Sequence, residues 1–375
     1  MRTGVATVPL DWGKCPPWLF RRMKRLSRGI VFAIVEEFGE EELIKRLSDP
    51  VWFQSLGCVI GFDWNSSGLT TTTLGALKEG LRGIESEIGV FICGGKGKTS
   101  RKTPSQIQEW GRFLKFPLNK IDDLVYASKT SAKVDSSLVQ DGFQIYHHNL
   151  IFSRKGSWAV VQQGLDTKNQ KARRYHWLSS NINSFIEEPH SGIVSQEKKK
   201  PLNLTAKESS KNREISRELV VEEPKQLIKD LKVVVERSPF KNNRSFTQMS
   251  LTNIEFDWHP VVNEKFDMKR LEKNISLAKN ANPSNFENLL TTKGVGPKTI
   301  RALSLVAELI YGAKPSYEDP ARYTFAYGGK DGTPYPVDRG VYDKSLEVIE
   351  RGINKSKISS KEKDLAKERL LSKFN

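Results

Sequence analysis

Apolar residues recur at helical spacing near the start of the chain. Between residues 18 and 37 they follow one face of a helix, at Leu19, Met23, Leu26, Ile30 and Ile34. This spacing forms a stripe of side chains that a helix of a globular protein buries against its neighbours. Shorter runs of the same kind predict further helices over residues 40–47, 50–60 and 69–81.

The pattern then changes to short apolar runs with the length of strands. Residues 88–93 predict a buried strand, which leads into a glycine-rich loop and then into a helix at Thr103. Thr103 and Gln106 have the spacing of a capping box, in which two side chains cap the first turn of a helix. Residues 143–152 and 157–164 predict two antiparallel strands joined by a short turn.

The second half of the chain contains few strand signals and is predicted to be mostly helical. Residues 195–204 are polar and rich in lysine, which is typical of an exposed linker. A second capping-box pattern at Thr205 and Glu208 predicts a helix directly after that linker. The sequence therefore predicts an α+β protein, with an N-terminal mixed α/β domain over residues 1–194 and a mostly helical domain over residues 205–375.

The chain is strongly basic, which changes the expected partner. Its 375 residues carry a formal net charge of +16, and its isoelectric point is near 9.6. Such a balance favours DNA or RNA, because binding releases the counterions that surround the phosphates. A lysine-rich surface without any binding role would give the same composition.

Cysteine use and hydropathy point to the inside of the cell. Cys15, Cys58 and Cys93 lie far apart and form no Cys-x-x-Cys pair, so reduced thiols are the simplest account. The N-terminus lacks the apolar core of a signal peptide, and no apolar run reaches the length of a membrane span. We expect a cytoplasmic protein, nucleoid-associated in a prokaryote, without a membrane partner. The oligomeric state stays open.

A Gly-x-Gly turn in the helical half is the most informative motif. It lies in the sequence Leu-Leu-Thr-Thr-Lys-Gly-Val-Gly-Pro-Lys-Thr-Ile-Arg-Ala, residues 289–302. Glycine permits a turn too tight for a Cβ atom, and the amides at the start of the next helix suit a phosphate. The residues expected to bind a nucleic-acid backbone are Gly294, Val295, Gly296, Lys298 and Thr299. An ordinary glycine-hinged pair of helices is the alternative.

Residues 286–310 resemble the helix-hairpin-helix element of DNA-binding and repair proteins. Gly-Val-Gly-Pro-Lys, ending at Lys298, and a later Pro-Val-Asp, ending at Asp338, are similar to motifs of the endonuclease-III-like DNA glycosylases. The resemblance implies that Lys298 attacks the sugar C1′ as an amine nucleophile, that Asp338 stabilises the cationic intermediate, and that no cofactor is needed. The two motifs lie further apart than in that family, because residues 313–333 are extra. The alternative is that Lys298 contacts a phosphate and has no catalytic role.

Ionisable side chains are also concentrated between residues 126 and 177. Asp135, Asp141 and His148 are candidate ligands of Mg²⁺ or Mn²⁺ for phosphodiester hydrolysis, and His176 is a further candidate catalytic group. No recognised metal-ligand spacing links them. The alternative is a polar hairpin packed on helices, with one histidine buried and hydrogen-bonded.

Strand alternation places His147 and His148 on opposite faces of their strand. Nearby, Arg173 and Arg174 are candidates for contacts with phosphates or bases. The glycine-rich loop after the first strand adds four basic candidates, Lys96, Lys98, Arg101 and Lys102. This loop is not a P-loop, because Ile92 stands where the first glycine of that motif is needed.

Four longer segments carry a second resemblance. They are Met-Arg-Thr-Gly-Val-Ala-Thr, Cys-Gly-Gly-Lys-Gly-Lys-Thr-Ser-Arg-Lys-Thr-Pro, Gln-Asp-Gly-Phe-Gln-Ile-Tyr-His-His and Ala-Arg-Arg-Tyr-His-Trp-Leu. They are similar to an uncharacterised family, a domain of unknown function of archaea and some thermophilic bacteria. The resemblance runs from residue 1 to about residue 344 and implies no activity.

Three functional hypotheses follow. The leading one is a DNA-binding repair protein of the DNA glycosylase/AP lyase type that acts on damaged DNA, with duplex or damaged DNA as its partner. The second is a metal-dependent nuclease with its site in the N-terminal domain and the hairpin as a DNA grip. The third is a non-enzymatic protein that binds DNA or RNA.

Overall fold

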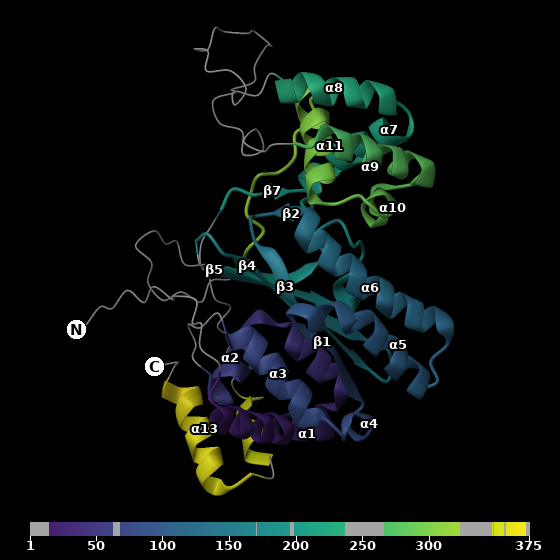
Figure 1. The fold of residues 1–375 in the computed structure, drawn as a ribbon. Helices are drawn as coiled ribbons and strands as arrows, with labels where there is room; N and C mark the ends of the chain where they lie inside the picture. Colours follow the sequence, from purple (N-terminus) through teal and green to yellow (C-terminus); the bar gives the residue numbers. More distant parts are fainter. Residues whose placement is uncertain are drawn as a thin grey trace, which may run out of the picture.

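An antiparallel sheet of five strands lies at the centre of the computed structural model (Figure 1). The structure describes residues 15–62, 68–169, 171–195, 199–236, 266–322, 347, 349–355 and 358–372. The strand order is β1-β3-β4-β5-β6, and the strands span Val90–Lys96, Gln144–Ser153, Trp158–Asp166, Lys171–Leu178 and His190–Ser195. Together with helices on both of its faces, this sheet confirms the predicted α+β class.

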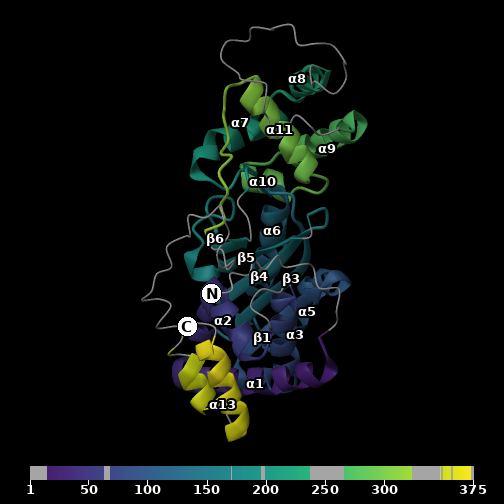
Figure 2. The ribbon, with the colours of Figure 1, turned by 90° about the vertical axis from the view of Figure 1, so that its left-hand side faces the viewer.

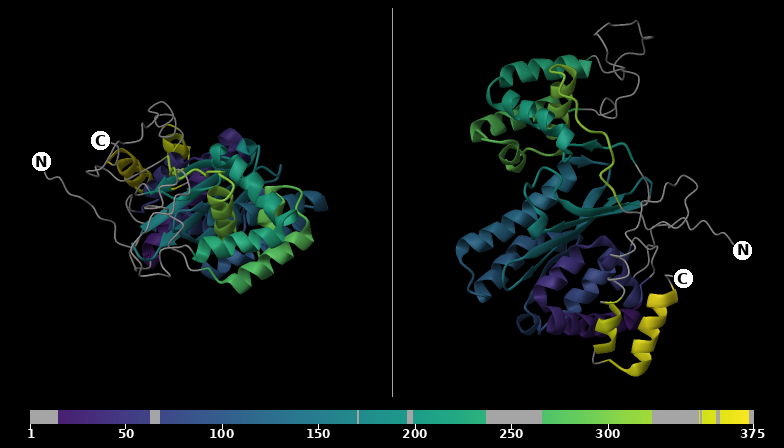
Figure 3. Two further views of the ribbon diagram at one scale, coloured as in Figure 1. Left: turned by 90° about the horizontal axis from the view of Figure 1, so that it is seen from above. Right: turned by 180° about the vertical axis from the view of Figure 1, so that it is seen from behind.

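The N-terminal helices cover one face of the sheet (Figures 1 and 3). Helices α1 to α4 span Pro17–Ser48, Pro50–Val59, Leu69–Leu81 and Glu85–Ile88. Helix α1 bends at Gly39, whose φ of 82° is not helical, so the predicted helices over 18–37 and 40–47 lie on either side of this kink. Asp49 then caps α2, because its carboxylate accepts a hydrogen bond of 2.8 Å from the amide of Val51.

Helices α5 (Thr103–Phe113) and α6 (Leu118–Ser137) cover the opposite face. Strand β3 shows how alternation divides the sheet between the two helical layers. Ile151 belongs to the core around α1 to α3, whereas Leu150 belongs to the core beneath α5 and α6. His147 likewise lies among residues of α3, and His148 bonds to α6. The predicted division of the two histidines between opposite faces is therefore confirmed.

The predicted helix at Thr103 is present, but its capping box is not. No side chain caps the start of α5. Instead, Gln106 Oε1 accepts hydrogen bonds from the amide of Gly94 at 2.8 Å and from Nζ of Lys78 at 2.9 Å. This side chain therefore joins α5 to β1 and α3, and a 3-10 turn, η1 (Gly97–Lys102), precedes the helix.

Five further helices form a bundle at one end of the sheet (Figures 1 and 2). They are α7 (Ser210–Val221), α8 (Pro224–Glu236), α9 (Met268–Ala281), α10 (Phe286–Thr291) and α11 (Pro297–Leu309). Helix α7 begins later than the capping-box pattern predicts, because the 3-10 turn η3 (Lys207–Ser209) precedes it. The hydroxyl of Thr205 donates to Asn203 Oδ1 at 2.7 Å rather than capping a helix.

The end of the predicted linker is buried. Leu202–Asn203 form strand β7, which pairs with β2 (Val139–Gln140), and Leu204 is fully buried. The larger buried cluster extends from α5 and α6 through Leu204 to α10 and α11. The mixed and helical parts of the chain therefore share a hydrophobic core, in contrast to the predicted separation by an exposed linker over residues 195–204.

Helix α13 (Ser360–Ser372) packs against α2 rather than against the bundle (Figures 1 and 2). Ile349, Ile353 and Ala366 lie in the core around α1 to α3. The C-terminal end of the predicted helical domain, residues 205–375, thus belongs to the opposite end of the molecule. None of the described helices combines the length and the apolar content that crossing a bilayer requires.

Candidate functional site

The Gly-x-Gly turn joins α10 to α11 as a tight hairpin. Gly294 has a φ of +93°, which glycine adopts readily and other residues rarely. A hydrogen bond of 3.2 Å from the amide of Val295 to the carbonyl of Thr292 closes the turn. Gly296 is the N-cap of α11 and provides no side-chain cap. Pro297 takes the first helical position, where a backbone N–H has no partner within the helix.

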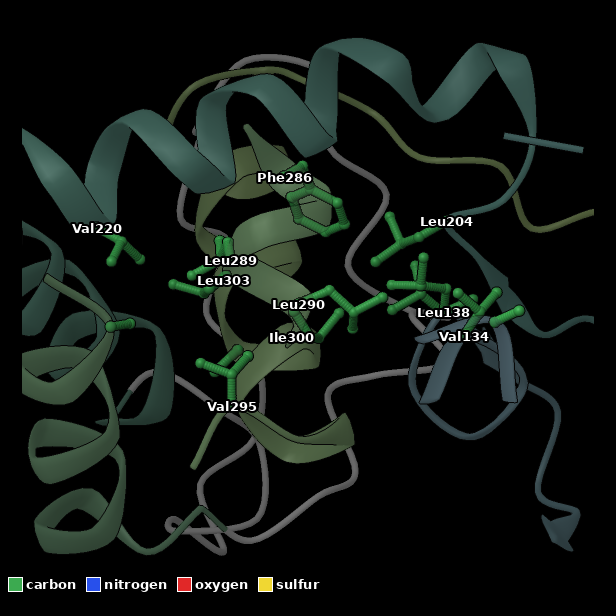
Figure 4. Packing of buried hydrophobic residues seen from close by; sticks show 14 of the residues in the cluster. Val134, Leu138, Leu204, Val220, Phe286, Leu289, Leu290, Val295, Ile300 and Leu303 are labelled. Carbon is green, nitrogen blue, oxygen red and sulfur yellow. The ribbon is translucent and has the colours of Figure 1, made fainter. Parts of the chain in front are cut away.

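The buried side of the hairpin packs against apolar side chains of the bundle (Figure 4). Val295 is only 3% exposed and belongs to the same buried cluster as Leu290 and Ile300. Burial of each such side chain contributes about 1.5–3 kcal/mol, which fixes the turn against the bundle. Lys293 and Lys298, on either side of the turn, are exposed to solvent. The hairpin therefore presents two cations from a rigid base.

Polar side chains of α6 and β2 form hydrogen bonds with the backbone of the hairpin. Lys133 of α6 donates to the carbonyl of Thr292 at 3.0 Å, and Gln140 of β2 donates to the carbonyl of Pro297 at 2.9 Å. Arg301 of α11 in turn donates to the carboxamide oxygen of Gln140. Burial lowers the pKa of Lys133. These bonds, together with the shared core, set the orientation of the hairpin relative to the sheet.

Two of the predicted hairpin contacts have buried side chains. Thr299 is 2% exposed, and its hydroxyl oxygen accepts a hydrogen bond of 3.2 Å from Nδ2 of Asn274. Val295 packs in the core, as described above. The side chains of Thr299 and Val295 therefore support the turn from inside. The groups that are at least partly exposed at the turn are the backbone of Gly294 and Gly296 and the side chains of Lys293 and Lys298.

The start of α11 has the properties of an anion site. The first amides of a helix have no carbonyl partner within it, and the glycine N-cap of α11 supplies none. The helix dipole adds a partial positive charge of about half a unit at this end. Lys298 lies in the first turn of α11. Its predicted partner Asp338, with Pro336 and Val337, lies outside the described residues.

Asp135 of α6 lies at the centre of a buried network on the α6 side of the sheet. Its Oδ1 is 2.5 Å from Nε2 of His190, and its Oδ2 accepts a hydrogen bond of 3.0 Å from Nε1 of Trp177. Gln162 donates to the same Oδ2. The other end of that carboxamide, Oε1, lies 2.8 Å from Nδ1 of His148. Both carboxylate oxygens are thus engaged within the core.

His148 connects this network to a serine of α6. Its Nε2 lies 2.9 Å from the hydroxyl of Ser128, and burial lowers the pKa of the imidazole. A serine hydroxyl beside a neutral histidine resembles the nucleophile and base of a hydrolase. However, Ser128 is only 2% exposed, so a substrate does not reach it in this conformation. The arrangement ties α6 to the sheet.

Asp141 belongs to a second buried network. Its Oδ2 accepts hydrogen bonds from Arg173 at 3.0 Å and from the hydroxyl of Tyr175 at 2.7 Å. Arg173 also forms an ion pair of 2.8 Å with Asp319. The Arg173 side chain is completely buried. This placement leaves no exposed guanidinium for the predicted contact with phosphates or bases.

Arg174 and His176 lie on the other side of the sheet, against α2 and α3. Arg174 donates to Nε2 of His176 at 2.7 Å and to Oε1 of Gln54 at 3.0 Å. Burial lowers the pKa of Arg174 to about 9 and that of His176 well below its usual range. Both side chains are buried, so neither the predicted nucleic-acid contact of Arg174 nor a catalytic role of His176 has solvent access here.

The predicted metal ligands are not assembled into one site. Asp135 and His148 share a network through Gln162, whereas Asp141 is held by Arg173 in another. No group of three or more His, Cys, Asp or Glu side chains able to hold a metal ion occurs within the described ranges. The nuclease hypothesis therefore lacks its predicted cluster in this part of the chain.

The basic loop after β1 is exposed, as its predicted role requires. Gly94 and Gly95, in the second half of β1, have positive φ values of 99° and 151°, and β1 leads directly into η1. The exposed cations are Lys96, Lys98, Arg101 and Lys102. The loop is therefore a second positively charged surface that phosphates can reach.

Two residues at the centre of these contacts have no signal in the sequence. His190 bonds to Asp135, which lies 55 positions earlier, and no motif connects the two. Lys78 lies within the amphipathic helix α3, where a lysine is typical of a solvated face. It donates instead to the carbonyl of Gly94 at 2.7 Å.

Comparison with known proteins identifies one relationship. Residues 4–337 match the model of a family described as "Protein of unknown function (DUF763)". No curated protein and no solved structure matches the chain.

Proposed function

The chain belongs to the DUF763 family, and we propose that it is a DNA-binding repair protein that holds the phosphate backbone at the hairpin of α10 and α11. The observation that carries this proposal is the uncapped start of α11 behind a Gly-x-Gly turn, with exposed Lys293 and Lys298 beside it. Backbone amides, helix dipole and lysines all favour an anion at the same point. The net charge of +16 strengthens the attraction to a polyanion.

The buried side of the hairpin supports the same function. A backbone contact needs donors held at a fixed spacing, because flexible donors lose conformational entropy when they bind. Val295 and Ile300 anchor the turn from below, and Gln140 bonds to the carbonyl of Pro297. The hairpin thus meets a phosphate with little reorganisation.

We further propose that Lys298 acts as an amine nucleophile on a damaged nucleotide. The unprotonated nitrogen attacks the sugar C1′ as the N-glycosidic bond breaks, and the base leaves with the bonding electron pair and takes up a proton. Opening of the sugar ring gives a Schiff base between Lys298 and C1′. Loss of a C2′ proton and departure of the 3′ phosphate then cleave the strand, and water releases the lysine. Asp338 is the proposed carboxylate that stabilises the cation.

The substitution Gly296→Val tests the backbone contact. A Cβ atom at Gly296 would have nothing within 4 Å, and its φ of −139° suits a branched residue, so the fold should tolerate valine. The valine methyls occupy the space through which a phosphate approaches. We expect at least about a tenfold loss of affinity for duplex DNA in fluorescence anisotropy, with an unchanged melting temperature.

Parallel titrations with RNA and with DNA carrying an abasic site identify the preferred nucleic acid. Unchanged DNA affinity of Gly296→Val would refute the hairpin as the contact.

Borohydride trapping on duplex DNA with one abasic site tests the chemistry. Reduction of the Schiff base leaves a covalent protein–DNA adduct on a denaturing gel. Lys298→Ala should abolish this adduct, whereas the matched variant Lys293→Ala, exposed on the other side of the turn, should retain it. An adduct that persists in Lys298→Ala removes that lysine from the mechanism. If EDTA stops DNA cleavage and Lys298→Ala leaves it intact, the result favours the hypothesis of a metal-dependent nuclease.

A further inference from the structure

A cavity of about 480 Å³ lies between α3, the end of β1 and the start of β3, away from the hairpin. Its volume falls within the range of small-molecule pockets. The start of α1 supplies part of its wall, so the cavity lies on the face of the sheet opposite α6. Neither of the two buried networks described above contributes to its lining.

His147 is the least satisfied polar group of this cavity. It is 2% exposed, and neither ring nitrogen makes a hydrogen bond of good geometry within the described chain, although the side chain of Asn149 lies close enough to raise the pKa of the ring slightly. Burial, helped by the positive charge of Lys96, lowers the pKa of His147 to about 3. The imidazole is therefore neutral at physiological pH and offers one donor and one acceptor. Buried polar groups are nearly always hydrogen-bonded, so such a ring indicates a missing partner.

Asn149 adds a second unsatisfied group to the same wall. Its Nδ2 donates to the carbonyl of Cys93 at 3.0 Å, but its Oδ1, which lies near the ring of His147, accepts no hydrogen bond of good geometry among the described residues. Asn149 lies two residues after His147 on β3, and strand alternation therefore places both side chains on one face. Together they present two acceptors and one donor, which suits a neutral ligand edge such as that of a nucleobase or a sugar.

Two lysines make another part of the cavity cationic. Lys78 is fixed by hydrogen bonds to Gln106 and to the carbonyl of Gly94, and Lys96 is exposed at the end of β1. The lining residues include no Asp or Glu in the described part of the chain. Lys96 leads directly into the basic loop η1, so the positive charge continues outward from the cavity. This end suits a phosphate.

The remaining wall is largely apolar, apart from Thr71 and Thr72 of α3. Phe20 of α1 and Leu74 of α3 lie on it, next to Gly75. A Cβ atom at Gly75 would lie 3.8 Å from the ring of Phe20, so the missing side chain leaves the space beside that ring open. An aromatic face next to an open slot is suited to a planar ring.

We propose that this cavity binds one nucleotide unit, with its phosphate at Lys78 and Lys96, its base beside Phe20 and its polar edge at His147 and Asn149. The nucleotide has two possible sources, a free nucleoside monophosphate or a terminal or unpaired position of a nucleic-acid strand. The inference adds a base-binding site to the proposed function, yet it depends on none of the hairpin residues.

Isothermal titration of the full-length protein with nucleoside monophosphates tests the proposal, with nucleosides and inorganic phosphate as partial ligands. Gly75→Leu should fill the slot without loss of stability, because leucine favours a helix more than glycine does. We expect at least about a tenfold loss of monophosphate affinity in Gly75→Leu and in His147→Phe. The exposed Lys168, in the turn between β4 and β5, is not part of the lining, so Lys168→Met should change affinity less than about twofold.

The same variants distinguish the two sources with a 5′-phosphorylated single-stranded oligonucleotide. If the protein binds a nucleoside monophosphate and Gly75→Leu removes this binding, the ligand of the cavity is a free nucleotide. If the protein binds no monophosphate but binds the oligonucleotide, and Gly75→Leu weakens that binding, the cavity holds one position of a nucleic-acid strand. Absence of both effects overturns the proposal. Gly296→Val leaves monophosphate binding intact if the cavity is independent, so failure of the hairpin proposal and failure of this one are separable.

Discussion

Replacing Gly94 by alanine tests the close passage of β1 past β3. The φ of Gly94 is +99°, where an L-residue costs about 1–2 kcal/mol. The new Cβ would also lie 2.1 Å from the carbonyl oxygen of His148 and 2.6 Å from the hydroxyl of Thr103. A backbone oxygen cannot rotate away, so β3 has to shift, and such overpacking costs about 1–3 kcal/mol. We expect the free energy of unfolding to fall by about 2–5 kcal/mol.

Gly97→Ala is the matched control in the same loop. Gly97 has a φ of +59°, but a Cβ there would have nothing within 4 Å. This substitution therefore carries only the backbone cost of about 1–2 kcal/mol. Urea unfolding of both variants, followed by circular dichroism, measures the difference. Equal losses of stability would refute the argument that β1 and β3 approach each other this closely at Gly94.

Three further predictions concern charge. Burial lowers the pKa of His147, His148 and His176, so the unfolded chain binds more protons below pH 6.5. The stability they confer is complete above that pH and falls by about 1.4 kcal/mol per pH unit for each histidine, for His147 down to about pH 3. Equal urea midpoints at pH 7.5 and about pH 5.5 would contradict this. Arg173→Met leaves Asp141 and Asp319 buried without their cation and should cost about 3–5 kcal/mol in thermal unfolding. A cost below about 1 kcal/mol would mean that the ion pairs are not formed. Lys293→Met and Lys298→Met should each reduce the slope of log K against log salt by about one for DNA binding, and an unchanged slope would show that the lysine contacts no phosphate.

Local patterns predicted the elements whose causes are local. The helix predicted over 69–81 is present as α3, Leu69–Leu81. Its apolar stripe favours a helix buried on one side, whichever elements it packs against. The opposite orientations of His147 and His148 follow from the pleat alone. The two predicted capping boxes are absent, for a reason that the spacing of the residues cannot show. Gln106 has better partners in Gly94 and Lys78, which the fold brings next to it.

The candidate site depends on contacts between distant parts of the chain. Asp319 lies 146 positions after Arg173, and the two residues meet only because the chain after α11 returns to the sheet. Arg173 and Arg174 resemble surface residues in the sequence, since polar residues on strands usually face water. Here other parts of the chain cover both faces of the sheet, so Arg173 is buried against Asp141 and Asp319 on one side and Arg174 against Gln54 of α2 on the other. Their chemistry is therefore structural.

The hairpin and the cavity are connected by a short stretch of chain, which limits their separation. Gln140 bonds to the hairpin carbonyl of Pro297, and His147 lines the cavity about seven residues later. The Cα atoms of Gln140 and His147 therefore lie at most about 25 Å apart. A stacked strand, which rises about 3.4 Å per nucleotide, covers a straight path of this length in about seven nucleotides.

One strand that occupies both sites should bind more tightly as it lengthens to about this number, and the gain should then level off. Anisotropy with single strands of about 3 to 12 nucleotides measures the profile. Gly75→Leu and Gly296→Val should each flatten it, because each removes one of the two points of attachment. A profile that rises evenly through the whole series, or that both variants leave unchanged, would show that the two sites do not act on one strand.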